Sequence, residues 1–321
     1  PSTPFHKPAF STFAVIPEQV LETTPVSEEP RRFGENMEHV LEIRHLSKTF
    51  GPTRALDDIN LAIDKGQMVA LLGPSGSGKS TLLRHLSGLV VGDRRALCCV
   101  TVMGRDIQKD GSLCPGVRGL RARVGFIFQQ FNLVERLSVL TNVLAGRLGR
   151  MPLWRSLPRW FTAEERQEAL KALERVGIAE HALKRAGNLS GGQQQRAAIA
   201  RALVQKAEII LADEPIASLD PHASHLVMQN LSQINQEDGV TVLVSLHQVD
   251  FALAYCTRVV ALKDGRVHYD GAAASCSQAK LREIYGSAFE EIAAIDPGGK
   301  ATDAQTNGRR SPSIRALAVN E

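Results

Sequence analysis

Residues 73–80 are Gly73-Pro74-Ser75-Gly76-Ser77-Gly78-Lys79-Ser80, which fits the phosphate-loop pattern GxxxxGK[ST]. The apolar run 68–72 before them predicts a strand buried on both faces, and residues 79–89 predict a helix. In this context glycines let backbone N–H groups turn inward around phosphate oxygens, and the helix N-terminus adds partial positive charge. An ordinary glycine-rich turn is the alternative, but the Lys-Ser ending favours a nucleotide site.

The side chains of this loop have distinct expected roles. We expect Lys79 to reach the β- and γ-phosphates and the Ser80 hydroxyl to coordinate Mg²⁺. The other residues expected to touch the nucleotide here are Gly73, Pro74, Ser75, Gly76, Ser77, Gly78 and Thr81.

A second apolar run, residues 208–212, ends in Asp213-Glu214-Pro215. Carboxylates at the C-terminal end of a buried strand face the loop of the neighbouring strand. We expect Asp213 to hold Mg²⁺ through water and Glu214, one residue further out, to polarise the attacking water. A strand end fixed by the turn at Pro215 is the alternative.

Two more polar side chains follow predicted strands. His247 comes after the run 240–246, where it could donate to the γ-phosphate, although a lone histidine at a strand end is often structural. Gln129 follows residues 124–128, and its amide can accept from Mg²⁺-bound water and donate to an oxygen. We place Gln129 among the catalytic and metal-binding candidates, with Gln130 as the neighbour that could be confused with it.

Composition excludes several classes of protein. The chain has 321 residues, and 43% of them are hydrophobic, which is too high a fraction for a wholly disordered chain. Its formal charge of +4 is too weakly basic for a dedicated nucleic-acid binder. No run approaches the ~20 apolar residues needed to span a bilayer, so we expect a cytoplasmic chain that docks on other subunits if it works at a membrane. We expect reduced, non-ligating thiols, because no CxxC or histidine cluster accompanies Cys98, Cys99, Cys114, Cys256 and Cys276.

The organisation of the chain is predicted as follows. Residues 1–37 form a disordered leader rich in Pro, Ser, Thr and Glu, residues 38–275 form one domain with a helical subdomain at about 131–206, and residues 276–321 form an extension disordered from about 297. The helical segment includes a capping box of Thr162 and Glu165. Strands are expected at 40–43, 59–63, 68–72, 208–212, 240–245 and 258–262, the last followed by an Asp264-Gly265 hairpin turn.

The pentapeptide Leu189-Ser190-Gly191-Gly192-Gln193 lies between the phosphate loop and the acidic strand end. With it, the chain resembles the ATP-binding cassette (ABC) family over about residues 39–275. The other matching motifs are the Walker A loop 73–80, Q-loop Gln129, Walker B 209–214, D-loop Ser218-Leu219-Asp220 and switch His247. The resemblance implies an α/β fold with a P-loop NTPase core, in which helices flank a mainly parallel sheet. It also implies an N-terminal antiparallel β subdomain and an inserted α-helical subdomain. Phe50 matches the aromatic residue that stacks on adenine.

The pentapeptide carries a mechanistic expectation. Ser190 opens a predicted helix that runs to residue 204, and such a helix end binds anions. Within one chain the Walker A helix already serves the phosphates, and in the family this motif serves the nucleotide of a second copy. The resemblance therefore implies a head-to-tail homodimer with two ATP molecules at its interface. The residues expected to contact ATP in trans are Ser190, Gly191, Gly192, Gln193 and Asp220.

Residues 128–133, 212–221 and 246–250 are similar to the ATPase subunits of bacterial phosphonate importers, as is the insertion 153–161 with Trp154 and Trp160. This resemblance implies an ATP-hydrolysing subunit at the cytoplasmic face of the inner membrane. The implied partners are two transmembrane permease subunits and, indirectly, a periplasmic solute-binding protein, with no nucleic acid. The two tryptophans either lie against a membrane or a membrane partner, or pack on their own subdomain.

Two alternative functions stay open. The chain could energise another ABC importer or exporter, for polar amino acids or lipoprotein release. A non-transport ABC protein of DNA repair or the ribosome is less favoured, because such chains carry long coiled coils or two cassettes. A plain P-loop kinase is excluded by residues 189–193 and His247.

Overall fold

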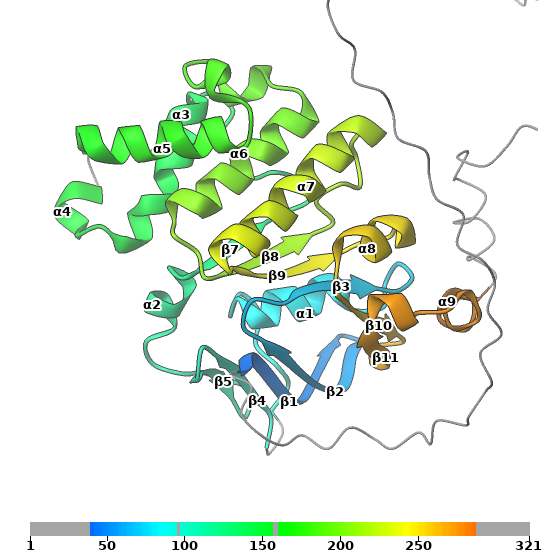
Figure 1. Ribbon diagram of the computed structural model, residues 1–321. Coiled ribbons are helices and arrows are strands. Elements are labelled where there is room, and N and C mark those ends of the chain that lie inside the picture. The colour runs from blue at the N-terminus through cyan, green and yellow to red at the C-terminus, as the bar shows by residue number, and fades with distance from the viewer. Residues whose placement is uncertain (1–38, 95–96, 157–159, 287–321) are drawn as a thin grey trace, which may run out of the picture. The chain divides into compact units, whose positions relative to one another are not determined.

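The computed structural model describes residues 39–94, 97–156 and 160–286 (Figure 1). The predicted leader 1–37 and the tail from about 297 lie outside the described residues. Within the described residues, no helix is long and apolar enough to cross a membrane.

A six-stranded sheet forms the centre of the domain, in the order β11-β10-β3-β9-β8-β7. Its strands are β3 (Met68–Leu72), β7 (Val124–Ile127), β8 (Ile209–Asp213), β9 (Thr241–Ser245), β10 (Arg258–Lys263) and β11 (Arg266–Ala272). All neighbours are parallel except β11, which returns antiparallel along the edge. The predicted Asp264-Gly265 turn joins β10 to β11 with φ angles of 50° and 74°, as a two-residue hairpin of this hand requires.

A second, antiparallel sheet has the order β2-β1-β4-β5-β6. Its strands are β1 (His39–Phe50), β2 (Thr53–Asp64), β4 (Cys99–Val102), β5 (Arg105–Lys109) and β6 (Ser112–Leu113). Ile59, Leu61 and Ile63 are buried and Asn60 is exposed, as the predicted alternation requires, although Ala62 is buried as well. This sheet confirms the predicted antiparallel subdomain.

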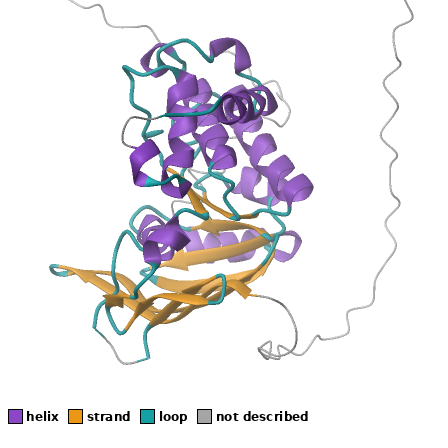
Figure 2. Cartoon of the chain, turned by 90° about the vertical axis from the view of Figure 1, so that its left-hand side faces the viewer, coloured by secondary structure: helices purple, strands orange, loops and turns teal. Residues whose placement is uncertain are grey.

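Helices cover the central sheet and form the inserted subdomain. They are α1 (Lys79–Leu86), α2 (Val117–Arg121), α3 (Val139–Leu144), α4 (Leu153–Ser156), α5 (Ala163–Arg175), α6 (Gly191–Val204), α7 (Pro221–Asp238), α8 (Val249–Tyr255) and α9 (Gln278–Tyr285). Short 3₁₀ turns span Ala145–Arg150, Ala179–His181, Ala186–Asn188 and Ala273–Ser275. Figure 2 shows most helices gathered at one end and the antiparallel strands at the other. The predicted capping box is present at the start of α5, where Thr162 and Glu165 exchange hydrogen bonds.

The core divides along the alternation of the central strands. Met68, Ala70 and Leu72 of β3 face a cluster shared with α5, α6 and α7, whereas Val69 and Leu71 face a cluster shared with α1 and the antiparallel sheet. Successive side chains of a strand point to opposite faces, so one short strand anchors both layers. The phosphate loop follows β3 and is therefore attached to a strand whose five residues are all buried. α9 lies beyond the predicted boundary at 275, yet its buried side chains belong to the first cluster.

Candidate nucleotide-binding site

The phosphate loop connects β3 to α1 through backbone conformations that favour glycine. Gly73, Gly76 and Gly78 have φ angles of 140°, 80° and 103°. A Cβ at Gly73 would lie 2.1 Å from the carbonyl oxygen of Leu262, and one at Gly78 would lie 2.5 Å from that of Ala55. Both positions therefore admit only glycine without movement of neighbouring backbone.

Lys79 is buried and points back into the loop. Its Nζ donates to the carbonyl oxygens of Gly73 at 2.7 Å and Pro74 at 3.0 Å. Burial lowers the pKa of the Lys79 ammonium, against the opposing charges of Glu214 and Asp213. The Ser77 hydroxyl is also buried and has no hydrogen-bond partner among the residues that the structure describes. A loop that holds a buried ammonium and an unpartnered hydroxyl fits an anionic phosphate chain.

Ser80 and Asp213 meet at the ends of α1 and β8. The Ser80 hydroxyl donates to Asp213 Oδ1 at 2.8 Å, which places the two predicted magnesium ligands side by side. A hydroxyl and a carboxylate are hard oxygen donors, and Mg²⁺ is commonly held by one or two such groups together with phosphate oxygens. The donor set therefore fits Mg²⁺.

Glu214 and His247 form a close pair beside this site. His247 Nε2 lies 2.6 Å from Glu214 Oε1. The hydrogen bond from His247 is the largest cause that lowers the pKa of Glu214, and the charges of His247 and Lys79 act in the same direction against burial. Glu214 is thus ionised at neutral pH, and its carboxylate can accept a hydrogen bond from a water molecule.

Ser245 organises both acidic residues, and the sequence analysis missed it. Its hydroxyl accepts from the Glu214 backbone N–H at 2.9 Å and donates to Asp213 Oδ1 at 3.0 Å. Glu214 has φ 48°, a left-handed conformation unfavourable for a residue with a side chain, and the Ser245 contact helps to hold it. The sequence feature that could have identified Ser245 is its position as a hydroxyl residue near the end of the mainly apolar run 240–246.

Phe50 and Gln129 occupy exposed positions. Phe50, at the end of β1, exposes 49% of its surface, and the Lys48 ammonium lies 5.2 Å from its ring centroid. The hairpin that follows Phe50 borders the loop, because the Ala55 carbonyl lies against Gly78. Gln129 is exposed in the turn after β7. No hydrogen bond joins either side chain to the phosphate loop within the described parts of the chain.

The pentapeptide 189–193 begins α6 as predicted. Ser190 is the exposed N-cap; its hydroxyl accepts from the Gln193 N–H, and the Gln193 side chain accepts from the Ser190 N–H at 3.0 Å. Asp220 caps the adjacent α7 by accepting from the Ala223 N–H at 2.9 Å. A Cβ at Gly192 would lie 2.7 Å from Ala223 Cβ, so the two helix starts pack closely. The starts of α6 and α7, which carry the residues predicted to act in trans, therefore lie side by side, with Ser190 and Asp220 exposed and Gly192 buried against α7.

The insertion between α3 and α5 presents its tryptophans outward. Trp154 and Trp160 each expose 68% of their surface, whereas Phe161 is buried. Arg155 donates to the Trp160 carbonyl and to Glu165, which ties the insertion to the start of α5. The two tryptophans are therefore not packed into their own subdomain, and their exposure favours the interpretation that they lie against a membrane or a membrane partner. Residues 157–159 lie outside the described part.

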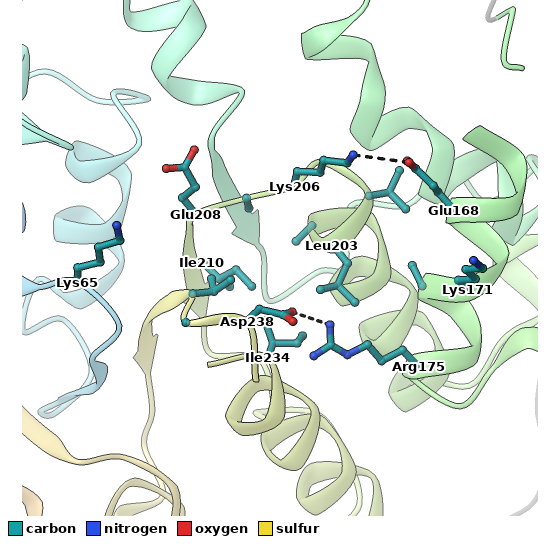
Figure 3. A pocket seen from close by; sticks show the side chains of 16 residues that line it. Lys65, Glu168, Lys171, Arg175, Leu203, Lys206, Glu208, Ile210, Ile234 and Asp238 are labelled. Atoms are coloured by element: carbon teal, nitrogen blue, oxygen red, sulfur yellow. Dashed lines mark hydrogen bonds and ion pairs between the residues drawn. The ribbon is translucent and has the colours of Figure 1, made fainter. Parts of the chain in front are cut away.

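A groove of about 620 Å³ lies beside the N-terminal ends of β8 and β9, at the opposite end of these strands from Asp213 and His247 (Figure 3). Leu203, Ile210 and Ile234 line its apolar part, and the ion pairs Lys206–Glu168 and Arg175–Asp238 cross it. None of the predicted site residues lines this groove. The groove lies between the helical subdomain and the core, and it is separate from the phosphate loop.

Comparison with known proteins agrees with this geometry. Residues 56–217 match the family model described as ABC transporter. The chain is 59% identical to the Phosphonates import ATP-binding protein PhnC of Stutzerimonas stutzeri and 56% identical to that of Escherichia coli O157:H7. Each alignment covers 251 residues and 78% of this chain, and 91% and 96% of the respective relatives. A dimeric ATP-binding cassette in a post-hydrolysis state with ADP and phosphate is 34% identical at a TM-score of 0.63, over 73% of this chain and 98% of that one. A nucleotide-free cassette is 26% identical at a TM-score of 0.65, over 79% and 98%.

Proposed function

The chain belongs to the ABC transporter family, and from that premise we propose that it is the ATP-hydrolysing subunit of a bacterial phosphonate importer. The assignment of phosphonate as the transported substrate rests on sequence identity. More than half of 251 aligned residues are identical to those of proteins named for phosphonate import. Two contacts support the ATPase chemistry. Ser80 of the phosphate loop is hydrogen-bonded to Asp213, and His247 contacts Glu214 beside it.

In this proposal the phosphates of ATP lie on residues 73–81. The N–H groups of the loop donate to phosphate oxygens, and Lys79 exchanges its contacts with the Gly73 and Pro74 carbonyls for the β- and γ-phosphates. Phe50 stacks on adenine, which gives affinity with little discrimination between purines. Ser80, Asp213 and Gln129 would hold Mg²⁺, which would supply positive charge to neutralise the phosphate oxygens.

Glu214 is the residue that orients and deprotonates the attacking water. Its lowered pKa keeps it ionised at neutral pH, and its left-handed backbone turns the carboxylate toward His247. We propose that His247 leaves Glu214 when ATP is present and donates to the γ-phosphate instead. The exchange frees the carboxylate for water only when there is a phosphate to attack.

A second copy of the chain completes each site. The surface of Ser190, Gly191, Gly192, Gln193 and Asp220 offers a helix N-terminus to the γ-phosphate of the partner. A similar cassette at 34% identity is a dimer, which supports this arrangement. ATP closes the dimer, and hydrolysis followed by product release reopens it.

The proposed membrane partners are two permease subunits, with a periplasmic solute-binding protein acting indirectly. The exposed Trp154 and Trp160 support a contact on the helical subdomain with a membrane partner, at the cytoplasmic face of the inner membrane. Substrate recognition resides in these partners, because no separate ligand domain is present among the described residues.

Complementation tests the cargo. A phosphonate-using bacterium that lacks its own import ATPase is given this chain and grown with a phosphonate as the sole phosphorus source. We expect growth with the chain, none with Lys79→Ala, and equal growth of both strains on inorganic phosphate. Failure of the intact chain, when it is expressed and hydrolyses ATP, would favour the alternative that it energises a different ABC transporter.

A further inference from the structure

The hydroxyl of Tyr285, on the C-terminal helix α9, contacts the phosphate loop directly. The backbone N–H of Gly73 donates to Tyr285 Oη at 2.9 Å, and both residues are buried. α9 is capped by Ser277 and buries Leu281 and Ile284 in the cluster that also contains half of β3. The helix therefore holds one hydroxyl at a fixed place beside the first residue of the loop.

Gly73 connects this hydroxyl to the lysine that faces the phosphates. Its N–H is bonded to Tyr285, and its carbonyl accepts from Lys79 Nζ at 2.7 Å. The Leu262 carbonyl of β10 packs against Gly73, since a Cβ built on Gly73 would lie 2.1 Å from the Leu262 oxygen. The Gly73 N–H belongs to the Leu72–Gly73 peptide and the Gly73 carbonyl to the Gly73–Pro74 peptide, so Tyr285 holds the first of these two peptides and Lys79 the second.

The hydroxyl has a role that the aromatic ring alone could not fill. The Tyr285 oxygen accepts from the Gly73 amide, and burial raises the pKa of this hydroxyl to about 12, so the acceptor is the neutral phenol. A phenylalanine would fill nearly the same space but would leave the Gly73 N–H without this acceptor, which is unfavourable for a buried donor.

We propose that Tyr285 is a positioning residue for ATP, whose hydroxyl fixes the Leu72–Gly73 peptide at the start of the loop, so that the loop N–H groups that follow face the phosphates. The inference rests on the proposed placement of ATP on residues 73–81. It makes nucleotide affinity depend on a C-terminal helix that lies outside the predicted cassette boundary at 275 and outside the matched family model, which ends at 217.

The test compares variants of the purified full-length chain by ATP titration calorimetry, steady-state hydrolysis and thermal unfolding without nucleotide. Tyr285→Phe should raise the Kd and KM for ATP about 3- to 10-fold, the range expected for one lost hydrogen bond, with kcat changed less than about 2-fold. Tyr269→Phe is the matched control, because its hydroxyl donates to the Ala272 carbonyl within β11 and should leave the Kd unchanged. Ile284→Val loosens the packing of α9 without touching the hydroxyl, and should lower the melting temperature without changing the Kd.

Three outcomes separate the possibilities. An unchanged Kd in Tyr285→Phe overturns the proposal, even if the melting temperature falls, because the hydroxyl then serves only the stability of the fold. An equal rise of Kd in Ile284→Val also overturns it, because loose packing would then explain the effect. Lys79→Ala distinguishes failure of the underlying site: if it too binds ATP normally, the phosphates do not lie on this loop.

Discussion

Replacement of Ser245 by alanine should affect both folding and catalysis, because one hydroxyl serves two acidic residues. Ser245 is fully buried, accepts from the Glu214 N–H at 2.9 Å and donates to Asp213 at 3.0 Å. Loss of the acceptor leaves a poorly solvated N–H, which costs about 1–3 kcal/mol of unfolding free energy. The left-handed backbone of Glu214 costs roughly 1–2 kcal/mol in the native chain, and without its anchor the residue should relax to relieve this strain and turn its carboxylate away. A displacement of that kind should lower kcat about 10- to 100-fold.

Urea unfolding and ATP hydrolysis at saturating nucleotide measure the two effects separately. Ser232→Ala is the matched control, because the Ser232 hydroxyl only accepts from Gln236 on the outer side of α7 and its loss should change stability by less than about 0.5 kcal/mol. If Ser245→Ala keeps a normal kcat while stability falls, the hydroxyl does not position Glu214. If neither the unfolding free energy nor kcat changes, the hydrogen bonds assigned to Ser245 contribute neither to stability nor to catalysis in solution.

Three further predictions concern the same residues and the insertion. Glu214→Gln should keep ATP binding, slow hydrolysis by about 10²–10⁴-fold and accumulate an ATP-bound dimer on size-exclusion chromatography, and a monomeric, fully active variant would contradict its role as base. The lowered pKa of Glu214 means that the folded state binds fewer protons than the unfolded state just below pH 4.5, so its stabilising contribution is complete above pH 4.5 and is lost as pH falls through the lower folded value. The difference in unfolding free energy between the native chain and Glu214→Gln should therefore shrink in acid, and a difference that stays constant from pH 7 to pH 3 would contradict the pairing with His247. Replacing Trp154 and Trp160 by serine should change the unfolding free energy by less than about 0.5 kcal/mol but reduce co-purification with the membrane subunits, and undiminished co-purification would remove them from that interface.

Local chemistry made much of this fold predictable. The apolar run 68–72 and the Asp264-Gly265 turn were located from sequence, because burial and turn geometry act over a few neighbouring residues. The first strand was predicted only at 40–43 but extends to Phe50, since register shifts against β2 interrupt its alternation. The helix predicted over 79–89 ends at Leu86.

The parts that sequence did not reveal depend on contacts between distant residues. Tyr285 and Gly73 are separated by 212 positions, and Ser245 lies 31 positions from Glu214, so no local pattern connects them. The phosphate loop was recognisable because its function demands glycines at fixed spacing. A supporting hydroxyl has no such spacing, and only the packed structure shows which serine or tyrosine supplies it.

In the proposed mechanism, each active site is completed by a second copy of the chain, which supplies Ser190, Gly191, Gly192, Gln193 and Asp220. Ser190→Arg blocks the exposed surface offered in trans, and Lys79→Ala disables the phosphate loop, so each variant alone should be inactive. Hydrolysis is then measured on a mixture of the two purified variants. Partial activity in the mixture is the predicted result, because a mixed dimer contains one site with neither defect. A mixture that binds ATP, forms mixed dimers and stays as inactive as its components would contradict the shared site.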